Sequence, residues 1–180
     1  MTQSPATDPN IDEILLTEEQ IGEAIARLGE QISSDYAGRD LLAVGVLKGA
    51  FVIMADLARA VTVPIEFDFM AVSSYGMASK TSGVVRILKD LDADIAGRDI
   101  LLVEGIIDSG LTLGYLMRNL AARGPSSVEV CALMQKKGTQ RVPTKVRYCG
   151  FEIPDVFVVG YGTDYGQRYR NLPYVATLKQ

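Results

Sequence analysis

Apolar residues recur along the chain in two patterns, and the first has a helical period. Its members are aliphatic residues three or four positions apart: Ile21, Ile25, Leu28 and Ile32. This spacing places side chains on one face of a helix. Thr17 followed by Gln20 has the form of a capping box, and Tyr36-Ala37-Gly38 is a suitable end. We therefore expect an amphipathic surface helix near the start of the chain.

Short, nearly continuous apolar runs form the second pattern. They are Leu41 to Val46, Asp99 to Glu104, Val128 to Met134 and Phe157 to Val159. Such runs, which lack strict alternation, are typical of parallel strands that helices cover on both faces. The sequence thus predicts an α/β fold with an open, mostly parallel twisted sheet flanked by helices.

Two of these strands are each followed by a tight turn and a helix. Leu47-Lys48-Gly49 leads into the apolar stretch Ala50 to Ala60, and Asp108-Ser109-Gly110 follows the second strand. A helix after the second turn is indicated by Leu113, Leu116, Met117 and Leu120, and Arg123-Gly124-Pro125 would end it. Because ligands of open α/β sheets bind beyond the carboxyl ends of the strands, both turns are candidate ligand contacts.

The middle of the chain predicts a hairpin. Ile65 to Ser73 and Val84 to Lys89 have the composition of paired strands, and a polar tip that includes Ser74 and Tyr75 joins them. A long polar loop in a compact domain is usually either a functional lid or a plain surface loop. We favour a lid over residues 73–90.

The composition indicates the class of protein and excludes several kinds of active site. The 180 residues include 48% hydrophobic and 22% charged residues, a balance that suits a single globular domain. No apolar stretch reaches the roughly 20 residues of a membrane helix, and residues 1–10 do not resemble a signal peptide, so we expect a cytoplasmic protein.

The chain has no histidine, which excludes His-dependent triads and imidazole-bound zinc. Cys131 and Cys149 are expected to be buried thiols.

Charge is distributed unevenly. The net charge of -4 argues against a nucleic-acid surface, which needs clustered basic residues. Residues 127–150 nevertheless carry five basic side chains against the single acid Glu129. This segment therefore suits an anionic small molecule.

The turn after the second strand has the features of a phosphate cradle. It offers successive N–H groups, a glycine, two hydroxyls and a helix start, contributed by Asp108, Ser109, Gly110, Leu111 and Thr112. A plain turn with Thr112 as an N-cap is the alternative. Glu104 adds a second carboxylate at the end of the strand. Two acids beside an anion site are costly unless ribose hydroxyls or Mg²⁺ offset them.

The same segment carries a family resemblance. Residues 103–112, Val-Glu-Gly-Ile-Ile-Asp-Ser-Gly-Leu-Thr, resemble the ribose-phosphate-binding motif of hypoxanthine-guanine phosphoribosyltransferases. Leu47-Lys48-Gly49 and residues 73–92 and 150–162 resemble further family segments in family order, and the resemblance extends over residues 12–178. It implies a type I phosphoribosyltransferase fold in one domain, with a core over residues 35–160. A hood from the N-terminal segment and residues 150–178, and a mobile lid, would complete it.

The resemblance also implies an activity. Members of this family transfer a 5-phosphoribosyl group from 5-phosphoribosyl 1-diphosphate to N9 of hypoxanthine or guanine. IMP or GMP forms and pyrophosphate leaves, with Mg²⁺ as the cofactor. A homodimer or homotetramer without a nucleic-acid or membrane partner is the expectation.

Family positions assign roles to residues of the donor site. The backbone at Lys48 and Gly49, beside a cis Leu47-Lys48 peptide, and the side chain of Arg170 would contact pyrophosphate. Glu104 and the segment Asp108 to Thr112 would hold the ribose and its 5′-phosphate. Glu104 would also belong to the metal environment.

Roles at the purine follow in the same way. Asp108, the catalytic group, would lie beside N7, and Lys136 would donate to the 6-oxo oxygen, which a 6-amino group could not accept. The remaining contacts are stacking by Phe157, backbone contact at Val158, and a second Mg²⁺ beside the purine at Asp164, while Ser74 and Tyr75 form the lid tip. Surface lysines at positions 48 and 136 and a core phenylalanine at 157 are the plain alternatives.

Three positions depart from the family pattern. Glu104-Gly105 stands where the family has Glu-Asp, so one ribose acceptor is missing, and Gly105→Asp should tighten donor binding unless the backbone requires glycine. Thr163 replaces a leucine, and Gly138-Thr139-Gln140 replaces a more basic stretch. These two changes leave the base preference open.

Two other interpretations compete. Gly105 suggests a weakened homologue that acts as a nucleotide-binding regulator. A flavin or dinucleotide protein is disfavoured because no Gly-x-Gly-x-x-Gly follows a strand.

Overall fold

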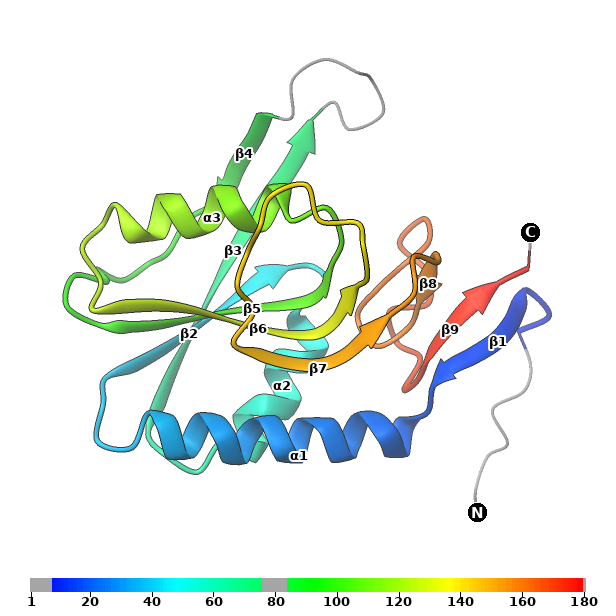
Figure 1. Ribbon diagram of the computed structural model, residues 1–180, viewed down its shortest axis with the longest axis horizontal. Coiled ribbons are helices and arrows are strands. Elements are labelled where there is room, and N and C mark those ends of the chain that lie inside the picture. Colours follow the sequence, from blue (N-terminus) through cyan, green and yellow to red (C-terminus); the bar gives the residue numbers. More distant parts are fainter. Residues whose placement is uncertain (1–7, 76–83, 180) are drawn as a thin grey trace.

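The computed structural model describes residues 8–75 and 84–179. Its centre is a six-stranded sheet in the order β4-β3-β2-β5-β6-β7 (Figure 1). The strands are β2 (Leu41–Leu47), β3 (Ile65–Tyr75), β4 (Val84–Lys89), β5 (Asp99–Ile107), β6 (Ser127–Lys136) and β7 (Tyr148–Ile153). All neighbours are parallel except β3 and β4, which form an antiparallel hairpin. The predicted open, mostly parallel sheet and the hairpin are confirmed.

Helices cover both faces of this sheet. α1 (Glu18–Asp35) and α2 (Phe51–Ala60) lie on one face, and α3 (Leu111–Ala121) lies on the other (Figure 1). The capping box is present, with Thr17 and Gln20 bonding each other's backbone N–H groups. No helix in the described part of the chain is long and apolar enough to cross a membrane.

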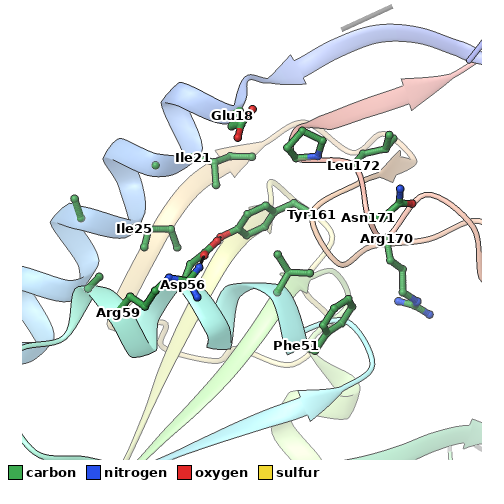
Figure 2. A pocket seen from close by; sticks show the side chains of 15 residues that line it. Glu18, Ile21, Ile25, Phe51, Asp56, Arg59, Tyr161, Arg170, Asn171 and Leu172 are labelled. Carbon is green, nitrogen blue, oxygen red and sulfur yellow. Dashed lines mark hydrogen bonds and ion pairs between the residues drawn. The ribbon is translucent and has the colours of Figure 1, made fainter. Parts of the chain in front are cut away.

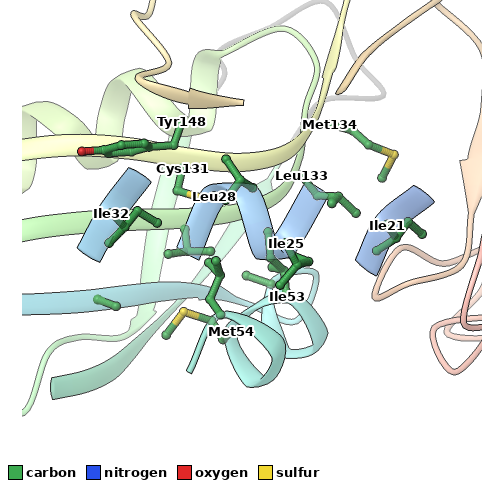
Figure 3. Close-up of a cluster of buried hydrophobic side chains, with 14 of the residues drawn as sticks. Ile21, Ile25, Leu28, Ile32, Ile53, Met54, Cys131, Leu133, Met134 and Tyr148 are labelled. Atoms are coloured by element: carbon green, nitrogen blue, oxygen red, sulfur yellow. The ribbon is translucent and has the colours of Figure 1, made fainter. Parts of the chain in front are cut away.

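Each face of the sheet has its own core. Strand β5 alternates between them: Leu101 and Val103 join the core under α1 and α2, while Ile100 and Leu102 join the core under α3. Figure 3 shows the first core, where residues of α1 and α2 meet β6. Both sides of the central strands are therefore anchored, which fixes the positions of the turns at their carboxyl ends.

A second, three-stranded sheet joins the two ends of the chain. Its antiparallel strands are β1 (Ile11–Leu16), β9 (Val175–Leu178) and β8 (Val158–Val159), in the order β1-β9-β8. The prediction that residues 157–159 belong to the parallel sheet is therefore wrong, because the strand next to β6 is β7. An apolar run of three residues does not specify its partner, and β7 mixes Gly150 and Glu152 with its apolar residues.

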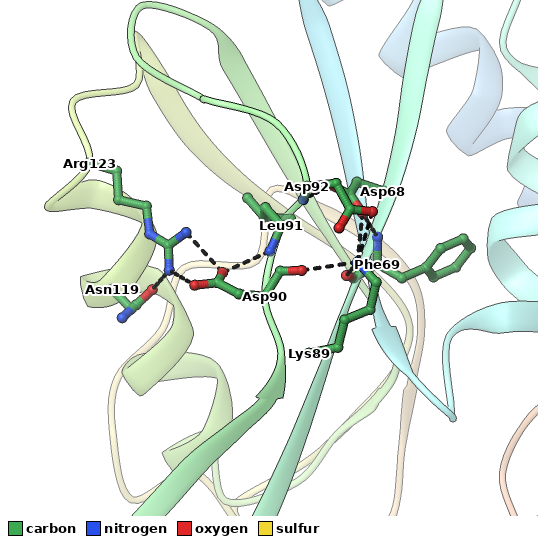
Figure 4. Close-up of polar contacts among 8 residues, drawn as sticks. All are labelled: Asp68, Phe69, Lys89, Asp90, Leu91, Asp92, Asn119 and Arg123. Atoms are coloured by element: carbon green, nitrogen blue, oxygen red, sulfur yellow. Dashed lines mark hydrogen bonds and ion pairs between the residues drawn. The ribbon is translucent and has the colours of Figure 1, made fainter.

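The hairpin of β3 and β4 is tied to the core at its base (Figure 4). The ammonium of Lys89 lies 3.2 Å from carboxylate oxygens of both Asp68 and Asp92. Arg123, just beyond α3, pairs with Asp90 at 2.8 Å. Ser74 and Tyr75 end β3, and the rest of the predicted lid tip, residues 76–83, lies outside the described residues.

Candidate active site

The two predicted turns lie side by side. β2 and β5 are parallel neighbours, so Leu47-Lys48-Gly49 and Asp108-Ser109-Gly110 emerge at the same edge of the sheet. The Leu47-Lys48 peptide bond is cis, as expected. Lys136, at the end of β6, and Asp155, just beyond β7, border the same edge.

The turn before α3 leaves a helix N-terminus open. Gly110 is the N-cap with φ of 74°, a conformation that favours glycine, and no side chain caps the helix. Thr112 is therefore not an N-cap. A hollow of about 180 Å³ adjoins this end, lined by Glu104, Ile106, Ile107, Asp108, Ser109, Gly110, Thr112 and Leu113. Unpaired N–H groups and the helix dipole make such an end suited to an anion.

The segment after β6 braces this turn, which sequence reasoning missed. The backbone N–H of Arg141 donates to the Ser109 carbonyl at 2.9 Å, and the Thr139 hydroxyl donates to the Asp108 carbonyl at 3.1 Å. Thr139 belongs to the stretch that departs from the family pattern. Its hydroxyl holds the turn instead of adding positive charge.

Glu104 is partly buried and lines this hollow. Burial raises the pKa of its carboxyl to about 8. Burial thus favours the neutral carboxyl, and hydroxyl donors or a cation that enter with a ligand would shift Glu104 toward its ionised form.

A glutamine joins the cationic residues beside the Lys48 turn. The side-chain oxygen of Gln167 accepts from Lys48 Nζ at 3.1 Å and from Arg170 Nη2 at 3.3 Å. Arg170 also lies 2.7 Å from Asp164 Oδ1. Its buried Nε has no hydrogen-bond partner among the described residues. Two cations and an unpaired donor therefore converge beside the turn, and no local pattern marked Gln167.

The carbonyl of Gly49 fills the space beside two other glycines. A Cβ atom at Gly105 would lie 2.9 Å from this oxygen, and one at Gly162 would lie 2.3 Å from it. Real Cβ atoms do not approach so closely, so both positions need glycine in this arrangement. Gly105 thus lets the Lys48 turn lie against β5.

Tyr161 anchors the segment that carries Gly162. Its hydroxyl donates to Asp56 of α2, which also pairs with Arg59. Figure 2 shows the Tyr161 ring reaching Asp56 between α1 and α2, in a hollow of about 650 Å³. The segment after β8 is therefore fixed to the helix that follows the Lys48 turn.

Lys136 occupies the other end of the site. Its ammonium lies 3.4 Å from Asp108 Oδ2 and 3.1 Å from Asp155 Oδ1, and only 11% of its side chain is exposed. Asp108 and Lys136 are thus brought together as predicted, and Asp155 joins them without having been predicted. A surface lysine at 136 is excluded by this burial.

Aromatic residues border a hollow of about 820 Å³ next to Asp155. Phe157 is exposed and meets Tyr165 edge to face, with ring centroids 5.8 Å apart, so it is not a core residue. Val158 is buried in β8. Thr163 is also buried, and its hydroxyl donates to the Gly160 carbonyl at 2.7 Å, so this departure from the family is satisfied within its own turn.

Comparisons with known proteins point to the same kind of site. The sequence model of the phosphoribosyl transferase domain family matches residues 12–166 of this chain. The hypoxanthine-guanine phosphoribosyltransferase of Mycobacterium tuberculosis is 55% identical over 94% of this chain and 87% of its own length. That of Bacillus subtilis is 48% identical over 94% of both chains. The crystal structure of a hypoxanthine phosphoribosyltransferase from Staphylococcus aureus superposes with a TM-score of 0.91 at 42% identity, covering 94% of this chain and 92% of that one.

Proposed function

This chain belongs to the phosphoribosyl transferase family, and we propose that it is a purine salvage enzyme specific for hypoxanthine or guanine. It transfers the 5-phosphoribosyl group of 5-phosphoribosyl 1-diphosphate to N9 of the base and forms IMP or GMP. The observation that carries this proposal is the Lys136–Asp108 pair, which stands beside the uncapped N-terminus of α3. One cleft thereby offers an anion site and a recognition site for a 6-oxopurine.

The donor occupies the side of the Lys48 turn. Its 5′-phosphate binds the N–H groups and hydroxyls of Asp108 to Thr112, and its ribose hydroxyls bond Glu104 and Asp108. The diphosphate lies against Lys48, Gly49 and Arg170, and the two positive charges that meet at Gln167 support an anionic ligand there. These donors stabilise the negative charge that develops on the leaving diphosphate.

The acidic residues suit Mg²⁺, although the described residues contain no group of three acids that would hold a metal alone. Mg²⁺ commonly uses one or two carboxylates together with substrate oxygens. Glu104 and Asp164 would provide such carboxylates, and Asp164 also pairs with Arg170 at 2.7 Å. When bound, Mg²⁺ neutralises charge on the diphosphate.

The purine occupies the side of Lys136. N9 forms a bond to C1′ of the ribose while the bond from C1′ to the diphosphate oxygen breaks, and its electron pair leaves with pyrophosphate. Asp108 accepts the proton that N7 loses. Lys136 donates to the 6-oxo oxygen, Phe157 stacks on the ring, and the backbone of Val158 meets the edge of the base.

Other parts of the proposal concern the whole protein. The hairpin, with Ser74 and Tyr75 near its tip, closes as a lid and excludes water from the reacting C1′. Residues 150–178 together with β1 form a hood over the base. The protein acts in the cytoplasm as a homodimer or homotetramer, and its free Cys131 and Cys149 suit that reducing compartment.

The test is a steady-state assay with Mg²⁺, the ribosyl diphosphate and each of hypoxanthine, guanine, xanthine and adenine. We expect nucleotide from hypoxanthine or guanine. Asp108→Asn should lower turnover by on the order of 10²- to 10⁴-fold, because the proton acceptor is lost, with a smaller effect on donor binding. If no base yields nucleotide although ligands bind, the protein is a nucleotide-binding regulator. An unchanged turnover of Asp108→Asn would remove Asp108 from the mechanism.

A further inference from the structure

We propose that Asp155 is a positioning residue, which holds the Lys136 ammonium for the 6-oxo group of the purine and keeps it from pairing with Asp108 alone. This inference rests on the proposed function. It adds to the base site a residue that does not contact the reacting atoms. The inference is drawn from a second carboxylate, that of Asp155, which contacts the mostly buried Lys136 in addition to Asp108.

The sheet places Asp155 beside Lys136. Lys136 pairs with Ile153 across β6 and β7, and Asp155 lies two residues beyond that pair. Its carboxylate accepts a hydrogen bond from the ammonium at 3.1 Å, a shorter distance than the 3.4 Å to Asp108. The lysine therefore bridges the turn after β5 and the segment after β7.

Asp155 also lies at the junction of two hollows. One, of about 570 Å³, is lined by Asp108, Ser109, Leu111, Gly138, Thr139, Gln140, Arg141 and Asp155. The other, of about 820 Å³, includes Asp155, Phe157 and Tyr165. The first hollow adjoins the turn before α3, and the second adjoins Phe157 and Tyr165. A base that extends from one hollow to the other would therefore lie next to the Lys136–Asp155 contact.

The number of N–H donors on Lys136 shows how Asp108 and Asp155 together orient its ammonium. An ammonium has three N–H donors and no acceptor. One donor bonds Asp155, and Asp108 forms an ion pair 3.4 Å away, so the two carboxylates limit where the remaining N–H groups point. A 6-oxo oxygen accepts one of these N–H groups, whereas a 6-amino group presents its own hydrogens to a cation.

Asp155 also affects the other partner of Lys136. Without Asp155, Asp108 would be the one remaining acid paired with the ammonium, although solvent screens this attraction because Asp108 is 57% exposed. Asp108 would then bind Lys136 with oxygens that it needs for the N7 proton. Two competing carboxylates thus keep the acceptor available.

The experiment compares Asp155→Asn with Glu152→Gln in the whole enzyme. Glu152 pairs with Lys137 at 3.3 Å on the same neighbouring segments, and both of those side chains are mostly exposed. Each variant removes one carboxylate charge from a Lys–acid pair without changing side-chain size. The measurements are kcat and KM for hypoxanthine, KM for the ribosyl diphosphate, and kcat/KM for adenine relative to hypoxanthine.

We expect Asp155→Asn to lower kcat/KM for hypoxanthine roughly 10- to 100-fold, since a charged hydrogen bond is lost. KM for the donor should stay unchanged, the adenine-to-hypoxanthine ratio should rise, and Asp155→Glu should recover part of the activity. Glu152→Gln should behave as the wild type.

Equal hypoxanthine kinetics in Asp155→Asn and Glu152→Gln would overturn the inference. So would equal losses for base and donor in Asp155→Asn, which would indicate a general structural defect. A wild-type protein that forms no nucleotide from any base would instead overturn the proposed function, so the two failures are distinguishable.

Discussion

Gly105 stands where the family pattern places an acid, and its surroundings explain why glycine suits this chain. The carbonyl oxygen of Gly49 occupies the space that a side chain at position 105 would enter. In the proposed site the ribose has one carboxylate fewer, while the Lys48 turn, which we propose faces the diphosphate, packs closely on β5. The absence of an acid at position 105 therefore goes together with the close packing of the Lys48 turn on β5.

Gly105→Asp is expected to weaken donor binding. The new Cβ would lie 2.9 Å from the Gly49 carbonyl and would displace the Lys48 turn, at a cost of about 1–3 kcal/mol. KM for the ribosyl diphosphate measures the effect. Gly105→Ala is the control, because it adds the same Cβ without the charge. Tighter binding by the aspartate variant alone would show that the missing ribose contact outweighs the close approach.

Residues of the site differ in how far the sequence predicts them. Asp108 and Gly110 lie in a contiguous motif with a local physical signature, so they could be identified. Gln167, Thr139 and Asp155 reach their partners across separate loops. Their roles depend on distances between segments, which no local pattern encodes.

Helices and strands with a local pattern could likewise be predicted, whereas those that depend on distant partners could not. The helical period of α1 and the continuous runs of β2 and β5 were sufficient to predict them, since each buries one face or both. β1 contains the exposed acids Asp12 and Glu13, and β9 has only four residues, so neither has a periodic signal. β1 depends on β9 for its pairing, and β9 lies between β1 and β8, which the sequence does not show.

The base of the hairpin also depends on contacts between elements. Burial acts to raise the pKa of Asp68, but hydrogen bonds from the backbone N–H groups of Asp92 and Phe69 and from Lys89 outweigh burial and hold this pKa below its usual value. Asp68 is only 10% exposed in its side chain, whereas Asp92, the other partner of Lys89, is 83% exposed. The ionised carboxylate of Asp68 therefore contributes most of the stabilisation here.

Asp68→Asn should lower the free energy of unfolding by about 1–3 kcal/mol at pH 7. A group whose pKa is depressed by folding stabilises the protein above its unfolded pKa, and this contribution is lost as the pH falls through the folded value. The difference from wild type should therefore shrink below about pH 4. Urea unfolding at several pH values measures it. Asp92→Asn, which removes the exposed partner, should change stability little, and an equal loss there would contradict this account.

At the scale of the molecule, two sheets share one core. Val175 of β9 is fully buried in the same cluster as Leu28 of α1 and Leu133 of β6. The small sheet that carries Val158 is therefore packed onto the large sheet that carries the donor turns. Both halves of the cleft rest on this common core.

Val175→Ala should consequently destabilise the whole protein by about 1–3 kcal/mol in a single transition. Urea unfolding followed by circular dichroism and by tyrosine fluorescence should give coincident curves. Thr177→Ala, at a partly exposed position of the same strand, should cost less. Separate transitions in the two signals would show that the small sheet unfolds on its own.

The pairing of β1 with β9 has a consequence for folding. Ile11 lies opposite Leu178, so the small sheet joins two segments that are far apart in the sequence. Contacts between distant segments cost more loop-closure entropy than contacts between near ones. The small sheet beside Phe157 is therefore expected to form late, after the strands that carry the Lys48 and Asp108 turns have paired.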